Sequence, residues 1–391
     1  MRAHFDLAGP AHPLEHPLAD WLYRRASASF GAAGIALDGP NPGDPQIHRP
    51  RALLRLLTQG TLGAGESYVD GDWDCAALDE LTCRLLTAHA DRRWGHWSAT
   101  GLAGPLAAHL ANLQSRSHSR QDIASHYDLD NDLYAAMLGS TMAYSCGYWA
   151  RASTLDEAQE AKHALICEKL GLQPGMRVLD IGCGWGGFAE FAARRLGVTV
   201  VGITLSAAQE ELARQRCAGL PVTILMQDYR DVAGTFDRIV SIGMFEHVGP
   251  RNYSTFFATA RARLVPDGLM LLHTIGGNRS EITPDPWIGR YVFPHSVLPS
   301  VAQIGHAIEG LFVLEDWHSF GADYDRTLMA WSANLDASWP RHARRHDERF
   351  HRLWRYYLLT CAGVFRARRN QLWQLVLSPR GVAGGYRRIA G

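Results

Sequence analysis

The sequence of 391 residues has almost no lysine, no net charge and no long apolar run. Lys+Arg and Asp+Glu number 39 each, and Lys162 and Lys169 are the only lysines. Because balanced charge creates no overall field toward a polyanion, we expect no nucleic-acid partner. The sequence contains no run of ~18 apolar residues, so it predicts no transmembrane helix. The first 24 residues lack the apolar core of a signal peptide.

Cysteine is scarce and follows no metal-binding or disulfide pattern. The seven cysteines are scattered, and none are spaced as Cys-x-x-Cys. The sequence therefore predicts neither a disulfide framework nor a metal site, and a reducing cytoplasmic compartment is the simplest expectation. What remains is an ordinary globular composition, with 47% hydrophobic and 20% charged residues. At this length we expect two domains.

A polar, glycine-containing region separates two patterns along the chain. Residues 100–105 and 114–121 are rich in Gly, Ser and Arg, as linkers often are. We therefore predict a small mixed or helical N-terminal domain that engages lipid at 1–118 and a catalytic domain at 119–391. In the smaller domain the pattern predicts helices near 51–59 and 76–89, with a loop at 62–73.

The larger domain alternates short apolar strands with helices. Strands are expected near 177–181, 198–204, 222–226, 237–242 and 268–275, and helices near 186–196, 207–218 and 253–264. A further helix is expected to start at Thr154, which has acids in the following turn. This α/β alternation predicts a doubly wound, methyltransferase-type Rossmann-like sheet covered by helices on both faces.

The strongest local signal is a glycine-rich turn after the first of these strands. Gly182, Gly184 and Gly187 let the backbone approach a ligand closely, and they also fit the dinucleotide-binding pattern. A dinucleotide site has an acid ~20 residues further on, at the end of the second strand, to hold the ribose, but the strand end at 198–206 has no acid and the next one is Glu210. Asp180 instead precedes the turn and suits a cationic amino group, such as that of S-adenosylmethionine. A nucleotide cofactor and a purely structural turn are the alternatives.

Ligands of such sheets bind beyond the carboxyl ends of the strands. Residues 204–209, 227–229, 245–247 and 273–275 occupy those positions in the predicted sheet. Asp228 is placed to accept a hydrogen bond from an adenine amino group. Its alternative reading is a solvated aspartate in a turn.

Seven motifs in the same order make the chain resemble the cyclopropane-fatty-acyl-phospholipid synthases. They are residues 144–149, 178–187, 243–250, 272–276, 285–288, 321–331 and 365–368, joined by residues 63–71 in the small domain. The resemblance implies that the chain adds a methylene group from S-adenosylmethionine across a cis double bond of an acyl chain in a membrane phospholipid.

The resemblance also implies a base for this chemistry, a bound bicarbonate that takes a proton from the transferred methyl group. The matching positions are Cys146, Glu246, His273, the backbone at Ile275, and Tyr324. Beside an anion, either Glu246 is neutral or His273 is cationic. Tyr148, Trp149 and Tyr324 are the aromatic candidates for stabilising positive charge on the acyl chain.

Cys361 lies in a further matching motif, and its catalytic role competes with that of a buried apolar thiol. The implied cofactor residues are Tyr144, Ser145, Asp180, Gly182, Cys183, Gly184, Gly186, Thr204, Leu205, Ser206, Gln209, Asp228 and Tyr229.

A substrate inside a bilayer implies transient contact with a membrane, at its inner face if the protein is cytoplasmic. The aromatic segment 285–294, which contains Trp287 and Arg290, suits such an interface, and packing as a lid over the pocket is the alternative. The resemblance also suggests a homodimer. Two other functions stay open: an acyl-chain methyltransferase that leaves a methyl branch, and a non-catalytic lipid-binding protein.

Overall fold

The computed structural model describes residues 17–89 and 131–389. The predicted linker stretches and the boundary at residue 118 lie outside these ranges, so that boundary stays a prediction. The described residues form two compact units. The first contains 17–89, 285–292 and 336–369, and the second contains 131–284, 293–335 and 370–389. Two segments from the later part of the chain thus belong to the first unit.

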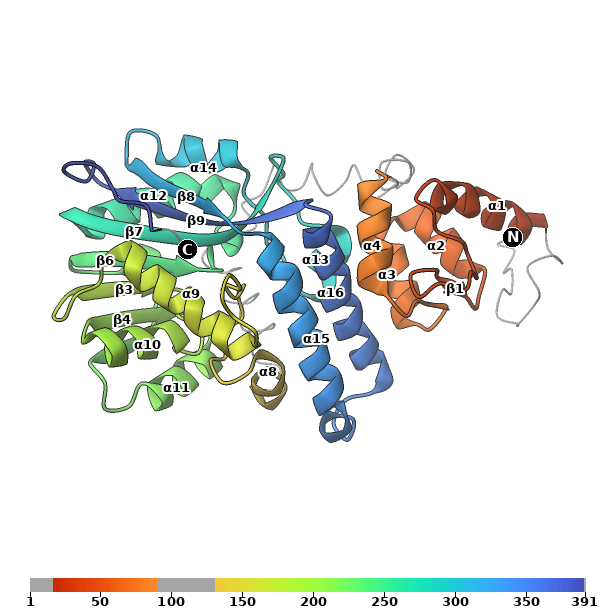
Figure 1. Cartoon of the computed structure of the whole chain (residues 1–391), viewed down its shortest axis with the longest axis horizontal. Coiled ribbons are helices and arrows are strands. Elements are labelled where there is room, and N and C mark those ends of the chain that lie inside the picture. Colours follow the sequence, from red (N-terminus) through yellow and green to blue (C-terminus); the bar gives the residue numbers. More distant parts are fainter. Residues whose placement is uncertain (1–16, 90–130, 390–391) are drawn as a thin grey trace. The chain divides into compact units, whose positions relative to one another are not determined.

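The second unit is built on one sheet (Figure 1). Its strands are β3 (Arg177–Ile181), β4 (Thr199–Thr204), β5 (Val222–Met226), β6 (Phe236–Ile242), β7 (Leu264–Gly277), β8 (Val313–Ser319) and β9 (Asn370–Ser378). Within residues 131–389, these seven strands pair in the order β5-β4-β3-β6-β7-β9-β8. The first five of that order are parallel. The chain winds outward in both directions from β3, so the order reverses between β3 and β6, where such sheets bind ligands.

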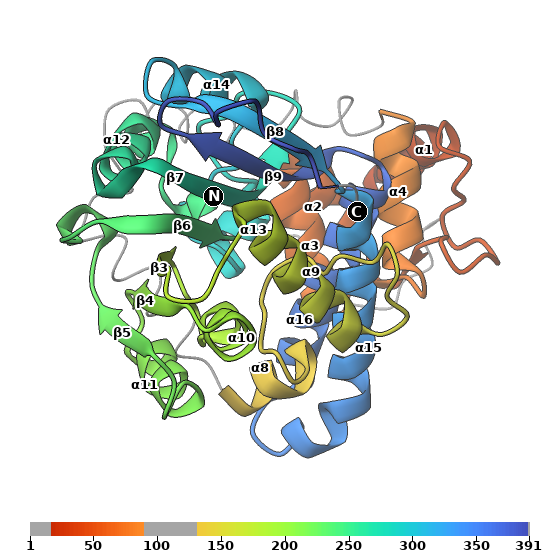
Figure 2. The ribbon, with the colours of Figure 1, turned by 60° about the vertical axis from the view of Figure 1, so that its left-hand side comes forward.

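Helices cover both faces of this sheet. They are α8 (Asn131–Leu138), α9 (Leu155–Leu170), α10 (Gly187–Leu196), α11 (Ala207–Arg216), α12 (Tyr253–Arg263), α14 (Val301–Ile308) and the start of α15 (Ala322–His342). Because side chains alternate along a strand, Val178 packs with α9 and α10, whereas the adjacent Leu179 packs with α12 and α14. Figure 2 shows these helix pairs on opposite sides of the sheet. The predicted doubly wound fold is confirmed.

Local signals explain several of the element boundaries. The Thr154 hydroxyl accepts from the Glu157 amide, and the Glu157 carboxylate accepts from the Thr154 amide, which makes the capping box that starts α9. The sequence predicts only a parallel sheet, but β9 pairs antiparallel with both β7 and β8. A continuous apolar strand gives no sign of its direction in the sequence, because direction depends on distant pairing partners.

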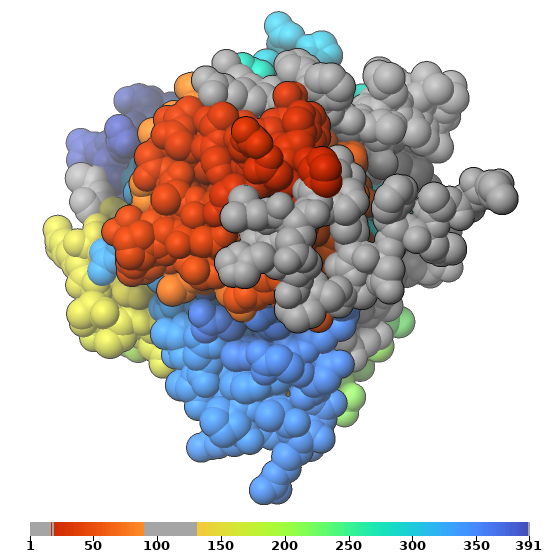
Figure 3. All heavy atoms as spheres, turned by 90° about the vertical axis from the view of Figure 1, so that its right-hand side faces the viewer, coloured from red at the N-terminus to blue at the C-terminus, as the bar shows by residue number. Residues whose placement is uncertain are grey.

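The first unit is mostly helical. It contains α1 (Pro17–Gly31), α2 (Arg51–Gln59), α3 (Thr61–Val69), α4 (Leu78–Thr87), α13 (Pro286–Tyr291), α16 (Glu348–Arg366) and a small pair of strands, β1 (Gln46–Ile47) and β2 (Trp73–Asp74). α16 packs against α3 and α4, and α13 packs against α3. Figure 3 shows residues from the start of the chain, in red and orange, beside the blue segment that includes α16.

The predicted loop at 62–73 is wrong, because most of it forms α3. Glycine disfavours a helix by about 1 kcal/mol relative to alanine, so Gly63 and Gly65 conceal this helix in the sequence. Both glycines allow close packing instead. A Cβ atom on Gly63 would overlap the carbonyl of Arg55 in α2, and one on Gly65 would overlap the Trp287 ring in α13.

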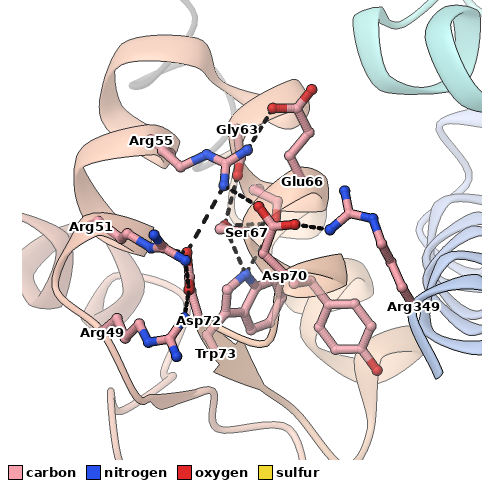
Figure 4. Close-up of polar contacts among 12 residues, drawn as sticks. Arg49, Arg51, Arg55, Gly63, Glu66, Ser67, Asp70, Asp72, Trp73 and Arg349 are labelled. Carbon is pink, nitrogen blue, oxygen red and sulfur yellow. Dashed lines mark hydrogen bonds and ion pairs between the residues drawn. The ribbon is translucent and has the colours of Figure 1, made fainter. Parts of the chain in front are cut away.

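An arginine and carboxylate network joins α2, α3 and the turn before β2 (Figure 4). The fully buried Asp72 carboxylate accepts from Arg51 at 2.7 Å on each oxygen and from Arg49 at 3.1 Å. Arg55 donates to Asp70 at 2.7 Å. A buried carboxylate is costly unless cations and hydrogen bonds surround it. These arginines therefore stabilise the fold of the first unit.

Trp287 belongs to the core of the first unit. Its side chain is 2% exposed and packs against the rings of Tyr356, at 4.7 Å between centroids, and Tyr291, at 5.5 Å. Arg290 pairs with Glu66 at 3.3 Å. The buried Trp287 ring is therefore not available to a membrane, whereas the interface expected for segment 285–294 as a whole stays a prediction. No helix among the described residues has both the length and the apolar character needed to cross a bilayer.

We expect Gly65→Ala to destabilise the first unit, because the added methyl group meets the Trp287 ring. Overpacking of this kind costs about 1–3 kcal/mol, more than the helix propensity that alanine gains. Chemical denaturation measures the change. Gly31→Ala is the matched control, since a Cβ atom there has no heavy atom within 4 Å. Equal stability of both variants and the wild type would contradict the packing account.

Candidate active site

The glycine turn after β3 forms one wall of a pocket at the carboxyl edge of the sheet. Gly182 and Gly184 have φ angles of 84° and 53°, which suit glycine. A Cβ atom on Gly182 would also lie 2.6 Å from the Met244 side chain. Asp180 stands just before the turn and is 1% exposed. Neither of its carboxyl oxygens has a hydrogen-bond partner among the described residues, so this buried acidic group faces the pocket without a protein donor.

Most of the predicted cofactor residues line this pocket together. They are Tyr144, Ser145, Asp180, Gly182, Cys183, Gly184, Thr204, Leu205, Gln209 and Tyr229. Thr204 donates to the Gln209 side chain at 2.7 Å, which fixes the amide of Gln209 at the end of β4. The pocket wall therefore comes from the ends of β3 and β4, the start of α11 and the segment before α9.

Three of the predicted cofactor residues do not line the pocket. Gly186 is the residue before α10 and has a φ of 81°. Ser206 caps α11 by accepting from the Gln209 amide at 3.2 Å. The Asp228 carboxylate accepts two hydrogen bonds from Arg230, each 2.8 Å. The contact between Asp228 and adenine stays a prediction. In this structure Arg230 donates to both oxygens of the Asp228 carboxylate.

Lys162 is a pocket residue that the motifs do not indicate. It projects from α9 and donates to the Ser145 hydroxyl at 2.8 Å and to the Gln159 side chain at 2.7 Å. Burial lowers the pKa of Lys162 to about 7. The pKa of Asp180 is raised to about 7, because the effect of burial exceeds the opposing effect of the nearby Lys162 charge. The chain has only two lysines, and both lie in the helix α9. This rarity is the sequence signal that could have pointed to Lys162.

A second polar group gathers at the ends of β6 and β7. Glu246 lies in the short helix η5 (Phe245–His247) after β6, and its carboxylate accepts from the Ile275 amide at 2.7 Å. The other Glu246 oxygen, Oε2, is buried and has no partner within the described part of the chain. Burial raises the pKa of Glu246 to about 7, although its hydrogen bond from Ile275 acts in the opposite direction. Glu246 is therefore largely neutral below pH 7.

His273 lies on β7, and its ring is held from one side. Gln374 Nε2 on the neighbouring β9 is 3.3 Å from His273 Nδ1. When that amide donates, Nδ1 accepts and the proton of the neutral ring sits on Nε2. His273 Nε2 is buried with no partner in residues 17–89 and 131–389. Burial holds the pKa of His273 well below its ordinary value, so the ring is neutral.

Cys146 and Tyr324 are linked through α15. Thr327, one turn after Tyr324, donates to Cys146 Sγ at 3.9 Å and accepts from the Gly147 amide at 3.0 Å. Burial raises the pKa of Cys146 well above its usual value, so it is a neutral thiol. Tyr324 is buried and packs edge-on against Trp331 at 6.0 Å.

Aromatic rings connect these residues to His273. The Phe320 ring contacts Tyr148 at 5.3 Å between centroids and His273 at 5.9 Å. Trp331 contacts Tyr144 of the pocket wall at 5.2 Å and the more distant Tyr324 at 6.0 Å. The structure thus places Cys146, Glu246, His273, Ile275 and Tyr324 in the same unit as the pocket, with their roles still predictions.

Cys361 lies in the first unit, on α16. Burial raises the pKa of its thiol to about 12, and the nearby Asp285 adds to the effect. Because the thiolate is the nucleophilic form, this environment disfavours a nucleophilic role. The catalytic role of Cys361 stays a prediction that its surroundings do not support.

Comparison with known proteins places this geometry in a family. Residues 114–375 match the family model described as mycolic acid cyclopropane synthetase. The chain is 52% identical over 373 residues to the cyclopropane-fatty-acyl-phospholipid synthase of Escherichia coli strain K12, covering 95% of this chain and 96% of that protein. It is 34% identical over 406 residues to the tuberculostearic acid methyltransferase UfaA1 of Mycobacterium tuberculosis, covering 95% and 93%.

Solved structures give the same result. The cyclopropane synthase MmaA2 from Mycobacterium tuberculosis superposes with a TM-score of 0.62 at 34% identity, covering 66% of this chain and 97% of that one. The mycolic acid cyclopropane synthase CmaA1, complexed with SAH and CTAB, has the same TM-score at 35% identity and the same coverage. The chain belongs to the cyclopropane synthase family of S-adenosylmethionine-dependent methyltransferases.

Proposed function

We propose that this chain transfers a methylene group from S-adenosylmethionine across a cis double bond of unsaturated acyl chains in phospholipids, with bicarbonate as the base. One observation supports this most directly. Asp180, Glu246 and His273 are buried at one sheet edge, and each has a polar atom with no partner among the described residues. Buried polar groups are rarely left unpaired in proteins, so these atoms fit polar ligands.

The residues around the glycine turn fit S-adenosylmethionine. The unpaired Asp180 carboxylate suits a cationic amino group, and the backbone at Gly182 and Gly184 allows close approach. The cofactor supplies an electrophilic methyl group. Tyr144 and Ser145 from the opposite wall would hold it in a dry pocket, where fixed orientation contributes much of the rate. An alkene is a poor nucleophile, so this orientation is essential.

The second polar group fits bicarbonate. A planar anion would accept from the His273 Nε2 proton and from neutral Glu246, whose Oε2 has no partner in the described residues. Bicarbonate supplies a base for the proton that the methyl group must lose. Because His273 and Glu246 are both neutral below pH 7, they avoid the like-charge conflict that an ionised Glu246 would create. Of the two protonation states that the sequence leaves open, the neutral Glu246 is favoured.

The aromatic side chains suit the acyl chain. Positive charge develops on that chain once its double bond attacks the methyl group, and aromatic faces attract cations. Phe320 contacts both His273 and Tyr148, and Tyr324 lies on α15, the helix whose Thr327 donates to Cys146. These rings would exclude water from the charged centre. The unsaturated phospholipid substrate is supported by the 52% identity to the Escherichia coli enzyme.

The alternative product is a methyl branch. The relative UfaA1 is named as a tuberculostearic acid methyltransferase and covers 95% of this chain. Its identity of 34% is well below the 52% of the cyclopropane synthase, which favours the cyclopropane product. A non-catalytic lipid-binding role is the remaining alternative, and the assays below would expose it.

The proposed location of the protein follows from its substrate, whereas the proposed assembly rests on the family resemblance. A phospholipid acyl chain lies in a bilayer, so we propose peripheral contact with the inner face of the cytoplasmic membrane and a homodimeric state. Trp287 is buried and does not supply this contact. Membrane binding must therefore use other surface residues.

Incubation with methyl-labelled cofactor should label unsaturated phospholipid vesicles and leave saturated vesicles unlabelled, because the double bond is the nucleophile. Mass analysis of the released acyl chains measures the gain of one CH₂ group. Label in saturated chains, or in no chains, would contradict the proposed function.

The affinity for bicarbonate should fall as pH rises through about 7, because Glu246 ionises there and repels the anion. The loss should reach ~10-fold per pH unit above the pKa. Initial rates at fixed bicarbonate-ion concentration measure it, with the cofactor saturating. Glu246→Gln keeps the shape but cannot ionise, so it should remove this pH dependence. A wild-type affinity that is unchanged from pH 6 to pH 9 would refute the assignment.

Cys146→Ser should lower turnover by roughly 10- to 100-fold, because small displacements near the reacting atoms are costly. Cofactor affinity should stay within about twofold of wild type, since Cys146 does not line the pocket of the glycine turn. Steady-state rates and calorimetric titration with S-adenosylhomocysteine measure the two effects. Cys83→Ser, in the first unit, is the control and should change neither. An equal loss of cofactor binding in Cys146→Ser would show that the residue is misassigned.

A further inference from the structure

Lys162 is a basic side chain in a place where a charge is expensive. It lies on the middle of α9 and has no exposed surface. A buried ammonium costs several kcal/mol unless opposite charge and hydrogen bonds compensate it. No residue in the described ranges forms an ion pair with Lys162 within 4 Å, although Asp180 attracts it electrostatically. A purely structural contact here would not require a cation.

The protein contacts of Lys162 use only two of the three N–H donors of its ammonium group. An ammonium group has three N–H donors. Two are used, toward Ser145 Oγ at 2.8 Å and Gln159 Oε1 at 2.7 Å. No third hydrogen bond to Lys162 is found within the described chain, and the side chain lines the pocket together with Ser145 and Asp180. The third donor is therefore available to a ligand in that pocket.

The pocket is thus lined by one basic and one acidic side chain that attract each other electrostatically. Asp180 carries a carboxylate with no hydrogen-bond partner among the described residues, and Lys162 carries an ammonium with an unused donor. The amino-acid end of S-adenosylmethionine is a zwitterion, with one ammonium and one carboxylate on the same carbon. The two protein charges are complementary to that pair.

We propose that Lys162 is a cofactor-binding residue that recognises the α-carboxylate of S-adenosylmethionine, with the Ser145 hydroxyl as its partner, while Asp180 takes the α-amino group. Lys162 donates to Ser145 Oγ, so the Ser145 proton is free to point into the pocket. Charge-assisted hydrogen bonds are about twice as strong as neutral ones. The inference rests on the proposed use of this cofactor and adds how its carboxylate is selected.

A structural role is the competing explanation. Gln159 donates to the Ser145 carbonyl at 2.8 Å and to the Ala143 carbonyl at 3.3 Å, and Lys162 donates to Gln159. Lys162 could then act only by keeping the segment around Ser145 in place. That role would help every ligand of the pocket equally, whereas recognition of a carboxylate would help only ligands that carry one.

The test is a cycle of two ligands and two proteins, measured by calorimetry without turnover. The ligands are S-adenosylhomocysteine and its decarboxylated analogue, which lacks only the α-carboxylate. In the wild type, loss of the carboxylate should weaken binding by roughly 10- to 100-fold. In Lys162→Met, which keeps the length of the side chain without its charge, the two ligands should bind within about threefold of each other. Lys162→Arg should restore part of the preference.

Gln159→Met is the matched control, because it removes the tie to the Ser145 segment and keeps the ammonium. It should weaken both ligands by the same factor and preserve the preference for the carboxylate. Thermal unfolding verifies that each variant is folded. If Lys162→Met is folded and keeps the full wild-type preference, the inference is overturned. If wild type binds neither ligand, the proposed function itself fails, and the inference fails with it.

Discussion

The structure depends on one constraint, which is that buried polar groups must find partners. Parallel strands β3, β6 and β7 end at the same edge of the sheet, where the chain reverses its winding. Asp180, Glu246 and His273 reach that edge in nearly complete burial, and part of each side chain has no partner in the described residues. Under the proposed function, the cofactor and bicarbonate would supply the missing partners and offset this cost.

The same burial gives these groups their chemistry. It raises the pKa of Glu246 to about 7 and holds the pKa of His273 well below its ordinary value. Two groups that water would leave charged or half-charged are therefore neutral hydrogen-bonding groups, as the proposed binding of bicarbonate requires. Burial of Cys146 likewise keeps a thiol rather than a thiolate. None of the three needs to act as a nucleophile, which suits a reaction whose nucleophile is the alkene.

Local patterns predicted the parts of this arrangement that local physics determines. Apolar runs predicted the strands β3 to β7, and a capping pattern predicted the start of α9. The position of Asp180 before the glycine turn indicated the cofactor. Long-range packing determines what the sequence concealed. The helix α3 depends on glycines that fit under Trp287, β9 depends on pairing with β7, and Lys162 reaches the pocket because α9 lies across the sheet. Motif resemblance supplied the roles of Cys146 and Tyr324, which no local pattern indicates.

The most direct test of the account is the fate of the methyl hydrogens. With a cofactor whose methyl group carries only deuterium, and vesicles of unsaturated phospholipid, the acyl product should retain two of the three deuterium atoms. That result means that a base removed one deuteron after transfer. A product that retains all three deuterium atoms would contradict the account, because it would mean that the chain leaves a methyl branch.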